Sequence, residues 1–138
     1  ENILKGAKII ACSGYTNDEE KPDFLLDGKT DTKWCDVSQT PNYVDFDLGK
    51  AQNISGWKMV NAGQESHSYI TNGCFLQGKM NPGDEWTTLD AIDGNHANVI
   101  SRPLNYDGKV RYIRLLVTRP TQSTGGRDTR IYELEVYK

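Results

Sequence analysis

Short runs of strand-forming residues recur along the whole chain, and no stretch of about ten residues carries a helical pattern. Residues 43–48 alternate polar and apolar side chains strictly, and residues 110–117 form a run rich in β-branched residues that suits a half-buried strand. The other segments with strand character are residues 7–12, 54–61, 74–77, 86–92, 99–103 and 130–137. Only residues 22–26 are expected to form a helical turn. Because clusters of Gly, Asn, Asp and Pro separate about eight short strands, the sequence predicts an antiparallel β-sandwich.

Length and charge limit the possible functions. The chain has 138 residues, which is enough to bury one core but too few for a catalytic domain plus a second module. We therefore expect residues 1–138 to form one domain, and the start at Glu1 suggests a piece of a longer protein. The formal net charge of −3 gives no support to binding of nucleic acids or anionic membranes. Without an apolar run of about twenty residues, no membrane insertion is expected.

The cysteines and tryptophans are expected to be structural. Cys12, Cys35 and Cys74 cannot all pair within one chain, and their spacing fits neither a redox pair nor a zinc site. We expect them to be buried and reduced, with a single disulfide as the alternative. The tryptophans are more often core residues than sugar-stacking residues at such positions, and all three are assigned to the core: Trp34, Trp57 and Trp86.

A turn in the first third of the chain has the donor chemistry of a cation site. Asp27 and Thr32 supply side-chain oxygens five residues apart, and Gly28 allows a sharp turn between them. Oxygen ligands, completed by backbone carbonyls, are what Ca²⁺ prefers. The alternative is that Asp27 only nucleates a turn that Thr32 caps, which needs no metal.

Six segments in a fixed order carry a family resemblance: residues 27–28, 32–35, 44–49, 83–86, 110–115 and 132–137. Together they resemble the discoidin-like β-sandwich superfamily. This superfamily includes the C domains of coagulation factors and the family 32 carbohydrate-binding modules attached to bacterial glycoside hydrolases. The resemblance implies a jelly-roll-like sandwich of the galactose-binding-domain type.

The resemblance also implies a structural Ca²⁺ that joins the first loop to the last strand. In the family the loop ligands are joined by a glutamate of the last strand, which by position is Glu133. Many relatives have Asp or Asn where this chain has Lys29, so a side-chain ligand is lost there. The implied ligands are the carbonyls of Phe24, Lys29 and Tyr132 and the side chains of Asp27, Thr32 and Glu133.

Residues 61–72 form a polar connection whose mixed carboxylate, amide, imidazole and phenol groups suit sugar hydroxyls. Galactose-binding relatives use an arginine and an asparagine five residues later, where this chain has His67 and Asn72. Their earlier histidine-to-tryptophan element is replaced by residues 35–38, so galactose specificity is not implied. Relatives attached to exo-acting glycosidases and chitobiase-like enzymes are more similar. The candidate carbohydrate contacts are Asp36, Asn61, Glu65, His67, Tyr69, Asn72 and Arg127.

These candidates have simpler explanations, which stay open at this point. Residues 61–72 could be a solvated loop without a ligand. Arg127 could pair with the neighbouring Asp128 and do nothing more.

No catalytic motif is present, and the sequence predicts a non-catalytic domain. Scattered carboxylates such as Asp90 and Asp93 would need a deep cleft in a larger scaffold to act as a glycosidase pair. The resemblance implies a monomeric module that tethers a bacterial glycoside hydrolase, secreted, periplasmic or at the cell surface, to glycans with galactose- or N-acetylglucosamine-type ends. The alternative is a spacer or docking domain that packs on the catalytic domain of its parent enzyme. Phospholipid binding is the weaker idea, because residues 64–72 and 121–129 contain neither Trp nor Phe.

Overall fold

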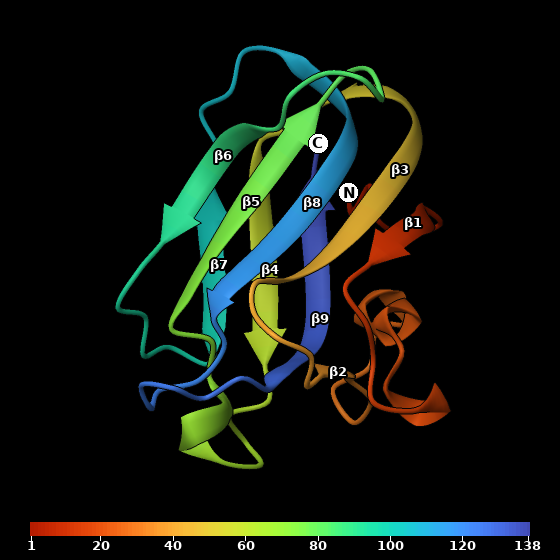
Figure 1. Cartoon of the computed structure of the whole chain (residues 1–138). Coiled ribbons are helices and arrows are strands. Elements are labelled where there is room, and N and C mark those ends of the chain that lie inside the picture. The colour runs from red at the N-terminus through yellow and green to blue at the C-terminus, as the bar shows by residue number, and fades with distance from the viewer.

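Two antiparallel β-sheets pack face to face in the computed structural model, which describes residues 1–138 (Figure 1). The five-stranded sheet has the order β1 (Lys8–Cys12), β3 (Asn42–Asn53), β8 (Lys109–Arg119), β5 (Gly73–Lys79) and β6 (Thr87–Ile92). The four-stranded sheet has the order β2 (Trp34–Asp36), β9 (Thr129–Tyr137), β4 (Gly56–Asn61) and β7 (Val99–Pro103). The predicted antiparallel β-sandwich is confirmed. No helix is long and apolar enough to cross a membrane.

The structure contains nine strands, and the additional one is β2. Its three residues pair with the start of β9, and a strand of this length is too short to show a period in the sequence. The helical turn predicted at residues 22–26 is confirmed as the 3₁₀ helix η2 (Pro22–Leu26). The sequence analysis missed the two other 3₁₀ turns, η1 (Asp18–Glu20) and η3 (His67–Tyr69).

The core lies between the two sheets and follows the predicted alternation. Val44 and Phe46 of β3 are fully buried, while Tyr43 and Asp47, which alternate with them, are half-exposed on the other face. Two of the tryptophans lie in the core as predicted. Trp34 donates a hydrogen bond from its indole nitrogen to the Gly14 carbonyl at 2.9 Å, and Trp57 is 1% exposed.

The assignment of Trp86 to the core is wrong. Trp86 precedes β6 and is half-buried on the outer face of the five-stranded sheet. Its ring centroid lies 4.4 Å from Lys79 Nζ and 4.7 Å from Arg114 Cζ. Arg114 also makes a two-fold ion pair with Asp45, at 2.6 and 2.8 Å. Trp86 therefore covers a charged pair on the sheet surface, where its ring gains cation–π contacts.

All three cysteines are free thiols, as expected, but only two are buried. Cys35 and Cys74 lie in the interior, whereas Cys12 at the end of β1 is half-buried. Burial raises the pKa of the Cys74 thiol to about 12, so this side chain acts as a small apolar core residue.

Asp90 connects the open edges of the two sheets. It lies on β6 and accepts hydrogen bonds from Trp57 Nε1 on β4 at 2.8 Å and from Arg102 Nε on β7 at 2.8 Å. Partial burial alone would raise the pKa of Asp90, but the hydrogen bonds from Arg102 and Trp57 outweigh it and lower the pKa. The carboxylate is therefore ionised near neutral pH, and two donors of the other sheet stabilise its charge.

Trp57→Phe is expected to lower the free energy of unfolding by about 1–2 kcal/mol, because it removes a buried donor to a charged acceptor and leaves a small void. Urea unfolding at neutral pH measures this change. Arg102→Gln is the matched control, since Arg102 serves the same carboxylate but its side chain is 49% exposed, and its loss is expected to cost less. A larger cost for Arg102→Gln than for Trp57→Phe would contradict this account of Asp90.

Candidate functional site

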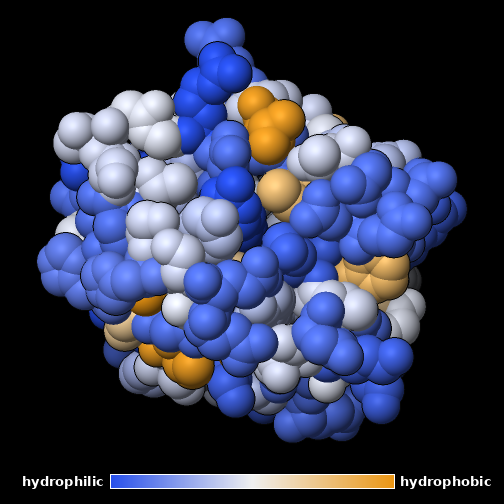
Figure 2. Space-filling model, turned by 90° about the horizontal axis from the view of Figure 1, so that it is seen from below, coloured by the Kyte–Doolittle hydropathy of each residue, from blue (hydrophilic) through white to orange (hydrophobic).

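Three connections meet at the end of the sandwich that carries η3, which is the lower end in Figure 1. They are residues 62–72, 93–98 and 120–128. Gln122 joins them: its backbone N–H donates to the Ser68 carbonyl at 3.0 Å, and its side-chain amide donates to Ile70 O at 2.9 Å and Asn95 O at 2.8 Å. Seen from below, hydrophilic residues cover most of this end, with only separate hydrophobic ones (Figure 2). The loops thus form one polar surface held together from within.

Two of the candidate sugar contacts point into the protein. Asn61 is fully buried; its amide donates to Asn98 O at 3.1 Å and its carbonyl accepts from Thr71 N at 3.1 Å. Asp36 is 1% exposed and accepts hydrogen bonds from the Ser38 backbone N–H at 2.9 Å and from the hydroxyls of Ser38 and Ser13. Both side chains are used to hold loops in place.

Glu65 fastens the 62–72 connection to β9 and to the loop before β2. It accepts hydrogen bonds from the Tyr132 hydroxyl at 2.5 Å and from Lys33 Nζ at 3.2 Å. Partial burial opposes ionisation, but the hydrogen bonds from Tyr132 and Lys33 outweigh it and lower the pKa of Glu65. His67, in contrast, begins η3 and is exposed, and its side chain makes no hydrogen bond or ion pair within the chain.

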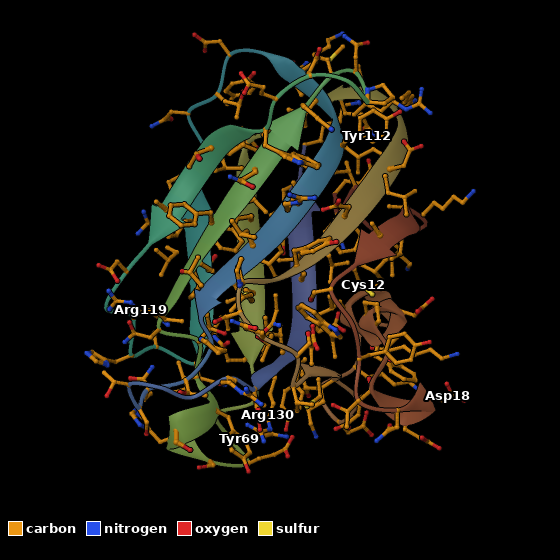
Figure 3. All side chains as sticks on the ribbon, viewed as in Figure 1. Cys12, Asp18, Tyr69, Tyr112, Arg119 and Arg130 are labelled. Carbon is orange, nitrogen blue, oxygen red and sulfur yellow. The ribbon has the colours of Figure 1, made fainter.

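Tyr69 and two arginines line a small hollow of about 420 Å³. The guanidinium carbon of Arg130 lies 3.8 Å from the centroid of the Tyr69 ring, and both side chains are seen at the lower end in Figure 3. Asp128 pairs with Arg130 at 3.0 Å. The alternative pairing of Arg127 with Asp128 is therefore absent, and Arg127 is exposed without an ion pair.

A larger hollow of about 750 Å³ lies beside the first and contains Asn72, Arg119 and Arg127 in its wall. None of its lining residues is hydrophobic. Asn72 Oδ1 is buried and has no hydrogen-bond partner. Arg127 lines both hollows, so they are neighbours around the 120–128 connection. A polar, concave surface of this kind can exchange hydrogen bonds with many hydroxyl groups at once.

The sequence analysis missed Arg119 and Arg130. Arg119 ends β8 and Arg130 is the second residue of β9, so both appear in the sequence as ordinary polar positions of strands. The available signal was that the polar connection 120–128 separates them, which brings the adjoining ends of both strands to the same end of the sandwich as Arg127.

The implied cation ligands Asp27, Thr32 and Glu133 are brought together. Asp27 accepts hydrogen bonds from the Thr32 hydroxyl at 2.5 Å and from the Lys29 backbone N–H at 2.9 Å. Glu133 on β9 is 5% exposed; its Oε1 accepts from the Gly28 backbone N–H at 3.0 Å, whereas its Oε2 is buried without a hydrogen-bond partner. A buried carboxylate oxygen without a donor is costly unless a proton or a cation reaches it.

The pKa shifts of Glu133 and Asp27 agree with this need for a proton or a cation. Burial and the neighbouring Asp27 carboxylate raise the pKa of Glu133 to about 8. The hydrogen bonds from Thr32 and Lys29 outweigh burial at Asp27 and lower its pKa. The chain has no group of three or more His, Cys, Asp or Glu side chains that could hold a metal, so a cation here would also need hydroxyl and carbonyl oxygens. This oxygen-only donor set fits a hard cation.

Glu65→Ala is expected to lower the free energy of unfolding by about 1 kcal/mol, because Tyr132 and Lys33 each lose a charged partner at a partly exposed site. His67→Ala is the control on the same connection and is expected to leave stability unchanged, since the His67 side chain makes no hydrogen bond or ion pair. Urea unfolding of the two variants at pH 7 separates the two residues. Equal effects of the two substitutions would show that Glu65 does not hold the connection.

The comparisons with known proteins agree on one family. A model of the F5/8 type C domain matches residues 9–134. The structure is similar to that of the family 32 carbohydrate-binding module from Streptococcus pneumoniae EndoD, with a TM-score of 0.85 and 27% identity over 100% of this chain and 99% of that one. No curated protein matches the chain.

Two more distant structures share the fold. One is chitosan-binding module 2 of a chitosanase/glucanase from Paenibacillus sp. IK-5, in complex with chitotriose; its TM-score is 0.80 and its identity 20%, over 99% of this chain and 100% of that one. The other is a Clostridium perfringens module in complex with GalNAc-β-1,3-galactose, with a TM-score of 0.82 and 17% identity over 100% of both chains.

Proposed function

The chain belongs to the F5/8 type C domain family, and from this premise we propose that it is a non-catalytic carbohydrate-binding module. The observation that carries the proposal is the pair of adjoining polar hollows at the loop end, which lie where three connections are held together by Gln122. Sugar hydroxyls both donate and accept hydrogen bonds, and a preformed polar surface can satisfy several of them without ordering loops first.

The candidate contacts divide into three groups in this proposal. Tyr69, Asn72 and Arg127 line the hollows and touch the glycan: Tyr69 offers an aromatic ring, and the other two offer hydrogen-bonding groups. Asn61 and Glu65 hold the connection after β4 in place and Asp36 holds the loop after β2, because their polar atoms are engaged within the protein. Exposed His67 lies outside both hollows and is assigned to the rim of the site.

Similar modules support glycans as the ligand class. Two of them were solved with an amino-sugar oligosaccharide and with a GalNAc-galactose disaccharide, and the module most similar in sequence among those described above comes from the protein EndoD. We infer that this module tethers a bacterial glycoside hydrolase, secreted, periplasmic or at the cell surface, to its substrate and so raises its local concentration. A single monomeric module is expected to bind weakly, because a small sugar offers little contact area and water already satisfies its hydroxyls.

Tyr69→Ala and Asn72→Ala are each expected to weaken glycan binding at least about tenfold, since each removes a side chain that lines one of the hollows. Binding is measured first on a glycan array in millimolar Ca²⁺ and then by calorimetry with the glycan that binds. Tyr15→Ala is the control, because Tyr15 is an exposed tyrosine, at 47%, that lines neither hollow. A blank array from folded protein would contradict the proposal and favour a docking or spacer domain that packs on the parent enzyme's catalytic domain.

We further propose that a structural Ca²⁺ sits between the loop after η2 and strand β9. The side chains of Asp27, Thr32 and Glu133 would hold it, together with the carbonyls of Phe24, Lys29 and Tyr132. The unpartnered Glu133 Oε2 and the raised pKa of Glu133 support this assignment, because both describe a buried carboxylate that lacks a positive charge. The ion would neutralise two nearby carboxylates and stabilise the fold, with no part in chemistry.

Removal of Ca²⁺ is expected to make stability fall as pH rises. The pKa of Glu133 is raised from 4.5 to about 8 in the folded chain, so the folded state binds its proton more tightly than the unfolded state does. This contribution is complete below about pH 4.5 and is lost as pH rises towards 8. Thermal unfolding in EDTA at pH 5 and pH 8 measures it.

Ca²⁺ is expected to reverse this trend, and Glu133→Gln is expected to abolish both effects. A Ca²⁺ concentration 100-fold above Kd adds about 2.7 kcal/mol to the wild-type protein at pH 8. Glu133→Gln removes the titrating charge but keeps the shape, so in EDTA at pH 8 the variant is expected to be at least as stable as wild type and to gain nothing from Ca²⁺. Glu135→Gln on the same strand is the control. An equal gain from Ca²⁺ in wild type and Glu133→Gln would rule out this site.

A further inference from the structure

We propose that the larger hollow at the loop end takes an anionic sugar residue, whose carboxylate or sulfate is bound by Arg127 and Arg119. This inference rests on the proposed carbohydrate-binding function and names its ligand class. The hollow of about 750 Å³ has two charged residues in its wall, and both are arginines. No Asp or Glu lines it, and the one carboxylate paired with either arginine is that of Asp93, beside Arg119.

Both guanidinium groups are available for a ligand. Arg127 is exposed and makes no ion pair within the chain, because the neighbouring Asp128 is paired with Arg130 at 3.0 Å. Arg119 meets only Asp93, at 3.5 Å, and the two side chains are 65% and 78% exposed. An ion pair of that length between exposed side chains contributes little, so a bound anion can replace it.

The chemistry of the wall favours charge over stacking. A guanidinium group presents a planar set of N–H donors that matches a carboxylate or sulfate with two parallel hydrogen bonds. The hollow offers no aromatic side chain against which the apolar face of a neutral pyranose could pack, and its one aliphatic ring, that of Pro120, is buried. Gln39, Thr40 and Asn72 remain for the hydroxyl groups.

The fold of the 120–128 connection positions Arg127 for this task. A Cβ atom on Gly126 would lie 2.0 Å from the Thr121 hydroxyl oxygen, so the two ends of the connection approach more closely than any other residue type would allow. Thr121 donates its hydroxyl hydrogen to Ser123 O at 2.8 Å within the same turn. Arg127 directly follows Gly126, so its backbone is held by this constrained turn. A backbone that is already held lowers the entropic cost of binding an anion.

The two hollows together suit an oligosaccharide with its acidic residue in the larger one. Arg127 contributes to both walls, and the smaller hollow contains Tyr69, whose ring can face an adjoining sugar. The smaller hollow is less able to bind an anion, because its Arg130 is already neutralised by Asp128 and stacked on Tyr69. Figure 3 shows Arg119 and Arg130 at this same end of the molecule.

The test uses sugars that differ only at C6. Calorimetric titrations of the whole chain compare galactose, galacturonate and galactose 6-sulfate, and then the corresponding glucose series. Where the glycan array identifies an oligosaccharide that contains one of these sugars, the oligosaccharide is titrated as well. An acidic member of a series is expected to bind roughly tenfold more tightly than its neutral counterpart at low salt, and the preference is expected to shrink as NaCl is raised. Whether carboxylate or sulfate binds more tightly identifies the acidic group.

Arg127→Gln is expected to lower the affinity for the acidic sugar roughly tenfold, and Arg119→Gln less, because Arg119 must first leave Asp93. Arg102 is an exposed arginine that lines neither of the two hollows at the loop end, and Arg102→Gln is expected to leave this affinity unchanged. Arg127 is exposed, so its variant is expected to fold, and an unchanged unfolding temperature verifies this. Equal or tighter binding of the neutral sugars would overturn the inference and leave the carbohydrate-binding function standing. A lack of binding to every glycan would overturn both.

Discussion

The buried carboxylate of Glu133 beside Asp27 is the constraint on how the last strand of this sandwich meets the loop after η2. Glu133 lies on β9, a strand that pairs with both β2 and β4, and it accepts a hydrogen bond from the backbone of Gly28, more than a hundred residues away along the chain. One of its oxygens has no donor, so the contact between the last strand and the first loop needs a proton or a cation to be favourable. The position of the loop after η2 and the pH response of stability are therefore expected to depend on the same carboxylate.

Strand β9 also positions the surface that we assign to glycan binding. Tyr132, next to Glu133, donates to Glu65, and Arg130 stacks on Tyr69 at 3.8 Å. Each of these contacts fixes part of the 62–72 connection against the sheet. Because a monosaccharide offers little binding energy, a site that had to order its own loops on binding would have almost none left. Rigid attachment to β9 is thus a physical condition for weak but useful glycan recognition.

The sequence predicted the sheet layers well and the site only in part, for definable reasons. Strict alternation at residues 43–48 was enough to place Val44 and Phe46 in the core. Successive side chains of a strand point to opposite faces of the sheet, whichever strands it pairs with. Trp86 was misassigned because its position over Arg114 depends on how β5, β6 and β8 align. Residues 61–72 were recognised as polar, but only the fold shows that Asn61 turns inward. Arg119 and Arg130 flank the 120–128 connection that carries Arg127, but only the fold shows that all three line the same pair of hollows.

The residues that hold the loop end together differ from the two exposed arginines that it presents. Gln122 and Asn61 hold the connections mainly through backbone carbonyl and N–H groups, which every sequence supplies at those positions. Arg119 and Arg127 take little or no part in this support, so changes there need not disturb the fold. A sandwich built in this way can exchange an arginine for a neutral side chain, and with it an acidic ligand for a neutral one, at almost no cost in stability. Ligand preference is therefore expected to follow the exposed side chains of the 120–128 connection more closely than the overall fold.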